Sequence, residues 1–300
     1  MKIKSHIANI KQTIYSFEII PPLRNHHLLE IFNTLYPLIE FHPRFVNVTS
    51  HKDNEVQKGL RRTGTIAICG AIIAKYEIDA IPHIICRKFT TQITEDLLIE
   101  LNFLGVYNLL ILRGDMMIIT KDTSIPNYSI ELIKQIVSLN NGTYQDESLK
   151  NRQDYDFCIG VASYPEKHFE SPNLEEDIFR LSEKIKAGSY FVMTQMFFDN
   201  NKYFDFIEIM RFAGLKVLII PGIKPISSID QLKSIPSNFY VKIPTNLVKI
   251  IRKYKRDIYS IGIEWAINQS IELKETGIPI IHYYTMNKPD NIYQIVIELI

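Results

Sequence analysis

Residues 14–24 read Ile-Tyr-Ser-Phe-Glu-Ile-Ile-Pro-Pro-Leu-Arg, a short β-rich apolar run that ends in two prolines. An open doubly wound sheet needs a glycine-rich turn after its first strand. The turn Pro21-Pro22-Leu23-Arg24 has the wrong chemistry for that role. This stretch therefore favours a closed α/β barrel over the open sheet that is its main structural rival.

The rest of the chain repeats one unit, a short apolar strand followed by a segment with helical periodicity, which is typical of a parallel sheet built from βα units. Helices are expected over residues 95–104, 174–187 and 203–212, among others. Glycines suited to helix C′ positions follow several of the helical segments: Gly105, Gly188, Gly214 and Gly277. Eight strands are expected, over residues 14–20, 44–49, 80–86, 107–112, 157–162, 190–195, 216–220 and 279–284.

Two irregular runs, residues 116–126 and 140–156, are interpreted as surface loops because regular βα units continue on both sides of them. No hinge rich in serine or glycine interrupts the pattern. We therefore expect residues 1–300 to form a single (β/α)8 TIM barrel of the α/β class.

Composition favours small-molecule chemistry. The formal net charge of +1 comes from 34 basic and 33 acidic residues dispersed along the chain, so no broad electrostatic field is available to recruit nucleic acid or a membrane. No apolar run approaches the ~18 residues of a membrane span, and a cytoplasmic location is expected. Cys69, Cys86 and Cys158 are odd in number and lie in apolar segments, which suits buried thiols rather than disulfides or a metal site.

Polar residues follow the predicted strands at their carboxyl ends, where the site of a barrel enzyme lies. Because the strands are independent in sequence, their ends predict one shared rim. The residues concerned are Ser16 and Glu18, Thr49, His83, Arg113-Gly114-Asp115, Tyr164 to His168, Gln195, Pro221-Gly222 and Tyr284 to Lys288.

Glu18 is the strongest candidate for chemistry. Strand alternation directs it into the barrel together with Ser16 if Tyr15, Phe17 and Ile19 pack on helices. Desolvation would raise the pKa of such a carboxyl group, so that it holds a proton near neutral pH. Glu18 is then a general acid, and the alternative is one half of a structural ion pair.

The loops after strands four and five suggest a ligand-binding rim. Arg113-Gly114-Asp115 is either a plain loop or a ligand contact in which the glycine allows close backbone approach. Tyr164 and His168 are either exposed packing residues or ligand contacts. Ser171 suits a helix N-cap with Pro172 at the first helical position, which would deliver these side chains to a helix N-terminus that favours a phosphate.

Two further features have two readings each. Asp177, Arg180 and Lys184 share one helical stripe, which is either a solvated ion-pair face or a cofactor-binding face. Gln195 ends an apolar strand, where its amide either satisfies core polarity or recognises a substrate amide.

From about Ser16 to Lys288 the chain resembles the methylenetetrahydrofolate reductase family, in its bacterial single-domain form. The segments that carry the resemblance occur in the family's order, each at a predicted strand end. They are residues 16–22, 46–49, 112–115, 159–168, 194–199, 221–225 and 282–287.

The resemblance implies a (β/α)8 barrel with noncovalent FAD that reduces 5,10-methylenetetrahydrofolate to 5-methyltetrahydrofolate. NADH or NADPH would donate electrons, and the two substrates would use one pocket in turn, in a ping-pong mechanism. It also implies a homo-oligomer without a C-terminal regulatory domain, which S-adenosylmethionine should not inhibit.

Residue by residue, Glu18 matches the acid that opens the folate ring, and Asp115 matches a carboxylate near flavin and pterin. Gln195 and Gln231 match substrate contacts, and Lys288 stands where an arginine often holds the folate tail. Thr49 matches a residue near flavin and nicotinamide, and Asp115 is counted with the cofactor positions as well. The remaining flavin-binding matches are His83, Arg113, Gly114, Tyr128, Ser129, Ala162, Tyr164, His168, Asp177 and Lys184.

Three departures from the family pattern concern binding rather than the acid. Residues 50–53, Ser-His-Lys-Asp, replace a glycine-containing turn near the flavin. Lys288 lacks the bidentate fork of arginine, and Ile235 lies near a position that can be aromatic. Two rival functions are a different flavin barrel, similar to proline dehydrogenase, and a catalytically silent folate- or flavin-binding protein.

Overall fold

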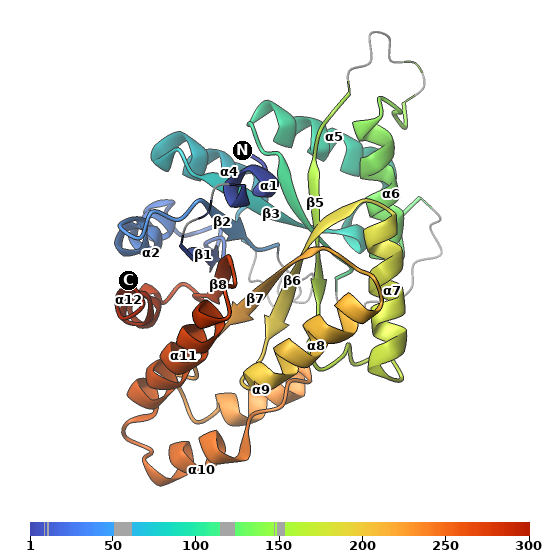
Figure 1. The fold of residues 1–300 in the computed structure, drawn as a ribbon. Helices are drawn as coiled ribbons and strands as arrows, with labels where there is room; N and C mark the ends of the chain where they lie inside the picture. The colour runs from blue at the N-terminus through green and yellow to red at the C-terminus, as the bar shows by residue number, and fades with distance from the viewer. Residues whose placement is uncertain (9, 11, 51–61, 115–123, 147, 149–153) are drawn as a thin grey trace.

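The computed structural model describes the chain from residue 1 to 300 except residues 9, 11, 51–61, 115–123, 147 and 149–153. Its parallel strands close into a barrel in the order β1 to β8, with β8 paired to β1 (Figure 1). The predicted TIM barrel with eight strands is confirmed. The strands are β1 (Ile14–Ile19), β2 (Phe45–Val48), β3 (Asp79–Ile85), β4 (Asn108–Leu112), β5 (Cys158–Ser163), β6 (Ser189–Met196), β7 (Leu218–Ile223) and β8 (Ile280–Tyr284).

Helices follow the strands and surround the barrel (Figure 1). The four glycines expected at helix ends all have positive φ, between 74° and 129°, so a residue with a Cβ would be strained there. The described helical elements are α1 (Ile3–Ile7), α2 (Leu29–Ile39), α4 (Thr65–Tyr76), η1 (Cys86–Lys88), α5 (Thr91–Phe103), α6 (Ser129–Asn140), α7 (Leu174–Lys186), α8 (Asn200–Phe212), α9 (Gln231–Phe239), α10 (Thr245–Lys253), α11 (Ile258–Glu275) and α12 (Pro289–Ile297).

Strand alternation separates two apolar layers. Tyr15, Phe17 and Ile19 of β1 belong to the large core between the sheet and the helices, as predicted. The amino-terminal half of the barrel interior is filled by a second cluster that includes Phe45, Ile81, Leu110, Phe191 and Ile220. Ile3 of α1 packs into this cluster as well, so α1 closes the amino-terminal end of the barrel and leaves polar chemistry to the opposite end.

The helix α7 begins at Leu174, as expected, but its expected N-cap is wrong. Ser171 was expected as the cap with Pro172 at the first helical position, whereas Asn173 caps the helix by accepting a hydrogen bond from the Glu176 amide. Ser171 is unavailable as a cap because its hydroxyl donates to the carboxylate of Asp177. A tertiary role of the side chain therefore outweighed the local capping preference.

The expected end of β7 is also wrong, because the strand continues through Pro221 and Gly222 to Ile223. Proline cannot donate to a sheet ladder. The pairing of β6 with β7 is irregular at this point, and the amide of Gly222 donates to the hydroxyl of Thr194 rather than to a backbone carbonyl. The irregularity accommodates the proline and extends the strand into the site.

The three cysteines are free and buried, as expected. Within the part of the chain that the structure describes, no helix has the length and apolar content needed to cross a membrane. The same residues contain no group of three or more His, Cys, Asp or Glu side chains that could hold a metal ion.

Candidate active site

Glu18 lies inside the carboxyl end of the barrel, with only 8% of its surface exposed. It is level with Asn47 of β2 on one side and with Tyr284 of β8 on the other. The Nε2 atom of His83, from β3, lies 3.7 Å from Oε2 of Glu18. Four residues from four neighbouring strands thus form one polar layer, on the carboxyl side of the apolar cluster that fills the barrel interior.

Burial raises the pKa of Glu18 from 4.5 to about 8, and the positive charge of Lys224 opposes this rise. The carboxyl group therefore holds its proton at neutral pH, which is the effect of desolvation that the sequence analysis predicted. The alternative reading, a structural ion pair, would require an ionised carboxylate held by a close cation. The structure gives Glu18 a long contact to His83 instead.

Lys224 is a member of this layer that the sequence analysis did not single out. It directly follows β7 and is buried, with 6% of its surface exposed. Burial lowers the pKa of its ammonium group to about 8, Glu18 acts to raise it, and Lys288 acts to lower it further. The available signal was a lysine two residues after Gly222, on the same strand face.

Deeper in the barrel, His282 donates to or accepts from the hydroxyl of Ser16 at 2.9 Å through Nδ1. Burial lowers the pKa of His282 to about 3, so the ring is neutral. Its Nε2 atom and Oδ1 of Asn47 are buried and have no hydrogen-bond partner in the described structure. Buried polar atoms are rarely left unpaired. Oδ1 of Asn47 can accept a hydrogen bond, and Nε2 of His282 can donate or accept one according to its tautomer.

A second group of candidate residues lies in the loop between β5 and α7. Arg113, at the end of β4, forms an ion pair with Glu170 of this loop. The ring of His168 contacts that of Tyr164, with centroids 4.8 Å apart. The carboxylate of Asp177 accepts from the backbone amide of His168 at 2.7 Å, in addition to its bond from Ser171. The fold therefore brings Arg113, Tyr164, His168 and Asp177 together, and Asp177 fixes the loop.

The ammonium group of Lys184, on α7, interacts electrostatically with Asp177 and Arg113 of this cluster. Burial lowers its pKa, attraction to Asp177 raises it, and repulsion by Arg113 lowers it. The structure gives Lys184 no hydrogen bond or ion pair with any described residue. Arg180, which shares its sequence stripe, is exposed and pairs with Glu176 at 3.0 Å. The stripe thus divides into a solvated residue and a residue that interacts with the cluster.

Position 114, after Arg113, requires a glycine for a steric reason. It has a φ of 88°, and a Cβ there would lie 2.5 Å from Cγ2 of Ile85. Asp115 lies outside the described residues, as do residues 51–53 of the turn after β2. Thr49 and Ala162 are half-buried at the ends of β2 and β5.

Tyr128 and Ser129 stand at the start of α6. Tyr128 is exposed, and its ring lies 5.9 Å from the guanidinium carbon of Arg87, whereas Ser129 is buried. The charge of Arg87 lowers the pKa of Glu170, after the larger effect of Arg113. The helix start is therefore close to the same loop cluster.

The predicted substrate residues follow β6, β7 and β8 around the rim, and Gln195 lines the same small pocket as Tyr164 of the loop cluster. Gln195 is half-buried at the end of β6, and its Oε1 accepts from the Met196 amide. Gln231 begins α9, and its Oε1 accepts from the Ser227 amide at 2.7 Å. Lys288 is exposed immediately before α12. Ile235 is not at the rim surface but buried in a satellite core beneath α9 and α10.

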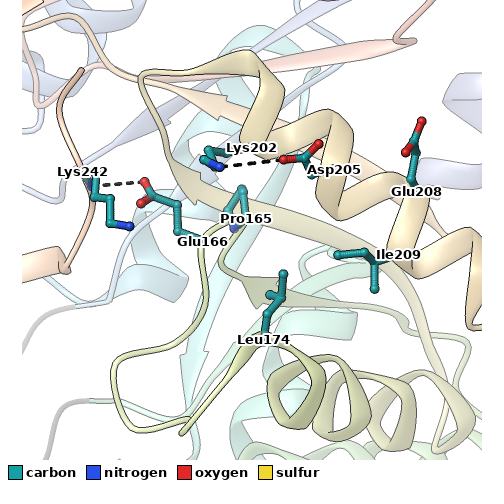
Figure 2. A pocket seen from close by; sticks show the side chains of 8 residues that line it. All are labelled: Pro165, Glu166, Leu174, Lys202, Asp205, Glu208, Ile209 and Lys242. Carbon is teal, nitrogen blue, oxygen red and sulfur yellow. Dashed lines mark hydrogen bonds and ion pairs between the residues drawn. The ribbon is translucent and has the colours of Figure 1, made fainter. Parts of the chain in front are cut away.

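A groove with a volume of about 390 Å³ lies outside the barrel, between the β5–α7 loop and α8 (Figure 2). Its charges compensate one another: the carboxylate of Glu166 accepts from the Lys242 amide at 3.1 Å, and Lys202 lies 3.8 Å from Asp205. None of the predicted catalytic residues lines it. The groove is therefore a surface feature separate from the interior layer around Glu18.

Comparison with known proteins identifies the family. The family model described as methylenetetrahydrofolate reductase matches residues 2–299. The chain belongs to the methylenetetrahydrofolate reductase family. It is 30% identical to 5,10-methylenetetrahydrofolate reductase of Buchnera aphidicola subsp. Baizongia pistaciae over 96% of this chain and 92% of the relative. The Escherichia coli enzyme of the same name is 27% identical over 93% and 88%, respectively.

Some relatives are longer. The chain spans 44% of methylenetetrahydrofolate reductase 1 of Schizosaccharomyces pombe, to which it is 29% identical over 92% of its own length. Among solved structures, an uncharacterised Clostridium thermocellum protein that binds two copies of 5-methyl-5,6,7,8-tetrahydrofolic acid aligns with a TM-score of 0.58. The alignment covers 98% of this chain and 96% of that protein at 17% identity, so it supports the fold alone.

Proposed function

We propose that this protein reduces 5,10-methylenetetrahydrofolate to 5-methyltetrahydrofolate, with FAD as its cofactor and NADH or NADPH as electron donor in a ping-pong mechanism. Membership of the family supports the reaction. The observation that carries the proposal is a buried carboxyl group at the carboxyl end of the barrel that holds a proton at neutral pH. We place this small-molecule enzyme in the cytoplasm.

Glu18 supplies the proton that this reduction needs. A substrate nitrogen must be protonated so that the five-membered ring of the folate opens to an electrophilic iminium. Because burial keeps Glu18 neutral near pH 7, it can donate that proton without first collecting one from solvent. Gln195, at the end of β6 on the same rim, offers an amide for the polar edge of the folate. We assign Gln231 and Lys288 to the rest of the substrate.

The cluster around the β5–α7 loop fits the phosphates of FAD. Lys184 and His168 offer donors near Arg113, and Lys184 is a largely desolvated cation with no hydrogen-bonding partner among the residues described. Phosphate oxygens are the ligands that such donors favour. Gly114 lets the backbone after Arg113 pass close to Ile85, where a Cβ would collide. When bound, FAD supplies a two-electron carrier between the nicotinamide and the folate.

The remaining flavin assignments are proposals for the same rim. Residues at the carboxyl ends of four strands would surround the flavin ring system. They are Thr49 after β2, His83 in β3, Asp115, which follows β4 in the sequence, and Ala162 in β5. Tyr128 and Ser129, at the start of α6, would contact the more distant part of the cofactor. His83 would contact both the flavin and the acid, because it also faces the carboxyl group of Glu18.

The two half-reactions test the proposal separately. In Glu18→Gln, flavin content and flavin reduction by a nicotinamide donor should stay near the parent values, because that half needs no acid. Reoxidation by methylenetetrahydrofolate should slow by about 10²–10⁴-fold, the usual contribution of general acid catalysis. Equal losses in both halves would mean that Glu18 has a structural role, and a parent protein that cannot bind FAD would refute the cofactor assignment.

A further inference from the structure

Lys224 lies in the same layer of the barrel as Glu18. The strands β7, β8 and β1 are neighbours, and Ile223 is level with Tyr283, which is level with Phe17. Lys224 is the next residue after Ile223, so it comes level with Tyr284 and Glu18, which are paired with each other. Strand alternation gives it the inward face of β7. Two residues more than 200 positions apart are thus placed in one layer by strand order.

The ammonium group of Lys224 is buried but unpaired. It has no hydrogen bond and no ion pair within 4.0 Å among the described residues, and only 6% of the residue is exposed. Its electrostatic neighbours are Glu18, which attracts it, and Lys288, which repels it. A buried cation without a partner is costly, and folds retain such groups mainly where a charge of opposite sign develops.

We propose that Lys224 is a positioning residue for the acid Glu18, and that its ammonium stabilises the carboxylate left when Glu18 gives its proton to a substrate nitrogen. The inference rests on the proposed function. In the step, the O–H bond of Glu18 breaks and an N–H bond forms on the substrate. Lys224 keeps its own protons, and the neutral acid facing a cation becomes an ion pair.

The pKa values agree with this arrangement. Burial raises the pKa of Glu18 and Lys224 opposes the rise; burial lowers the pKa of Lys224 and Glu18 opposes the fall. Both groups consequently hold protons at pH 7, which is the starting state that the step requires. Burial alone would make Glu18 a reluctant acid, and the nearby cation makes proton release easier without removing the proton beforehand.

Other groups also face Glu18. His83 approaches from β3 at 3.7 Å, Tyr284 from β8 interacts with it electrostatically, and Asn47 of β2 is level with it but uncharged. Lys288 is exposed near the start of α12 and reaches Glu18 only indirectly, through Lys224. All four remain unchanged in the variants below, so their effects are common to every measurement.

The first test needs neither cofactor nor turnover. Infrared difference titration of the protein without FAD follows the protonated carboxyl band of Glu18, which is identified by its loss in Glu18→Gln. Lys224→Met keeps the length of the side chain and removes the charge. Its titration midpoint should rise by about 1–3 pH units, the usual effect of an opposite charge within about 4–6 Å. Lys249→Met, at an exposed position on α10, removes the same charge and should leave the midpoint in place.

The second test measures the folate half-reaction of the reduced holoenzyme across pH. In Lys224→Met, the alkaline limb of the pH–rate profile should move to higher pH together with the infrared midpoint of Glu18. The rate of folate reduction at pH values below that limb should fall, but by less than in Glu18→Gln. Reduction by nicotinamide should not change. Lys224→Arg should keep the parent midpoint because it retains the positive charge. If the Lys224→Met variant does not fold, Lys224→Gln repeats the test.

The outcomes separate the two proposals. An unshifted midpoint in Lys224→Met, with folate reduction abolished in Glu18→Gln, would refute the role of Lys224 and leave the acid in place. Normal folate reduction in Glu18→Gln would refute the acid itself. A shift of equal size in Lys249→Met would show that the effect comes from the net charge of the protein rather than from this pair.

Discussion

As pH rises from 5 to 7, Glu18 should increasingly destabilise the protein without FAD, whereas His282, which burial keeps neutral, acts in the opposite direction in the parent and in Glu18→Gln alike. The pKa of Glu18 is raised from 4.5 in the unfolded chain to about 8 in the folded barrel by burial. Between these values the folded state keeps the proton and the unfolded state has lost it. At this residue the unfolded state therefore binds fewer protons, and the contribution of Glu18 to the free energy of unfolding decreases with increasing pH. Replacing Glu18 by glutamine removes this dependence.

The size of the effect follows from the two pKa values. One pKa unit corresponds to about 1.4 kcal/mol, so the cost of keeping Glu18 in its buried position is about 1 kcal/mol at pH 5 and about 3 kcal/mol at pH 7. Glu18→Gln should therefore gain roughly 2–3 kcal/mol over the parent across this range. The range ends at pH 7 so that Glu18 is still neutral in the folded parent. Lys224 then faces an uncharged side chain at position 18 in both the parent and Glu18→Gln.

Urea unfolding of both proteins without FAD at pH 5, 6 and 7 measures the difference directly. Glu264→Gln, at an exposed position on α11, controls for the loss of one carboxylate from the chain. It should change little between these pH values. If the difference between Glu18→Gln and the parent is the same at pH 5 and pH 7, Glu18 titrates normally in the folded state. The assignment of a neutral acid would then be wrong.

Two further predictions concern the cofactor loop and the barrel core. His168→Ala and Lys184→Ala should each bind FAD about ten- to a hundredfold more weakly in a titration of apoprotein, since a charge-assisted hydrogen bond contributes roughly 1.5–3 kcal/mol. Lys186→Ala, exposed on the same helix, is the matched control, and unchanged affinity in both test variants would exclude this loop as the phosphate site. Gly160→Ala should lower stability by about 1–3 kcal/mol in thermal or urea unfolding, because a Cβ there would lie 2.1 Å from the ring of Phe191. Gly64→Ala, where a Cβ meets no atom within 4 Å, should cost much less, and equal losses would refute the packing argument.

The fold and the inward position of Glu18 were accessible from sequence because both depend on local patterns. The alternation of Tyr15, Phe17 and Ile19 with Ser16 and Glu18 assigns each side chain to one face of a strand before any neighbour is known. Both faces are as predicted. The C′ glycines were equally accessible, since a positive φ after a helix is a local requirement.

The errors arose where a distant residue changed a local preference. Ser171 and Asn173 are both good N-cap residues, and the choice fell to Asn173 because the hydroxyl of Ser171 bonds to Asp177. Pro221 is a strand terminator by local rules, but the irregular pairing with β6 and the hydroxyl of Thr194 allow β7 to continue past it. Sequence spacing carries no information about either partner.

By itself, the sequence determined the strand pattern, the closed α/β architecture and the presence of a carboxyl group facing the barrel interior, because period-two and helical patterns are properties of neighbouring residues. Only the tertiary structure decided that Lys224 shares a layer with Glu18. That pairing depends on the closure of β8 onto β1, which brings β7 within reach of the first strand. Burial and charge at this layer are properties of the closed barrel, and they set the pKa values on which the proposed chemistry depends.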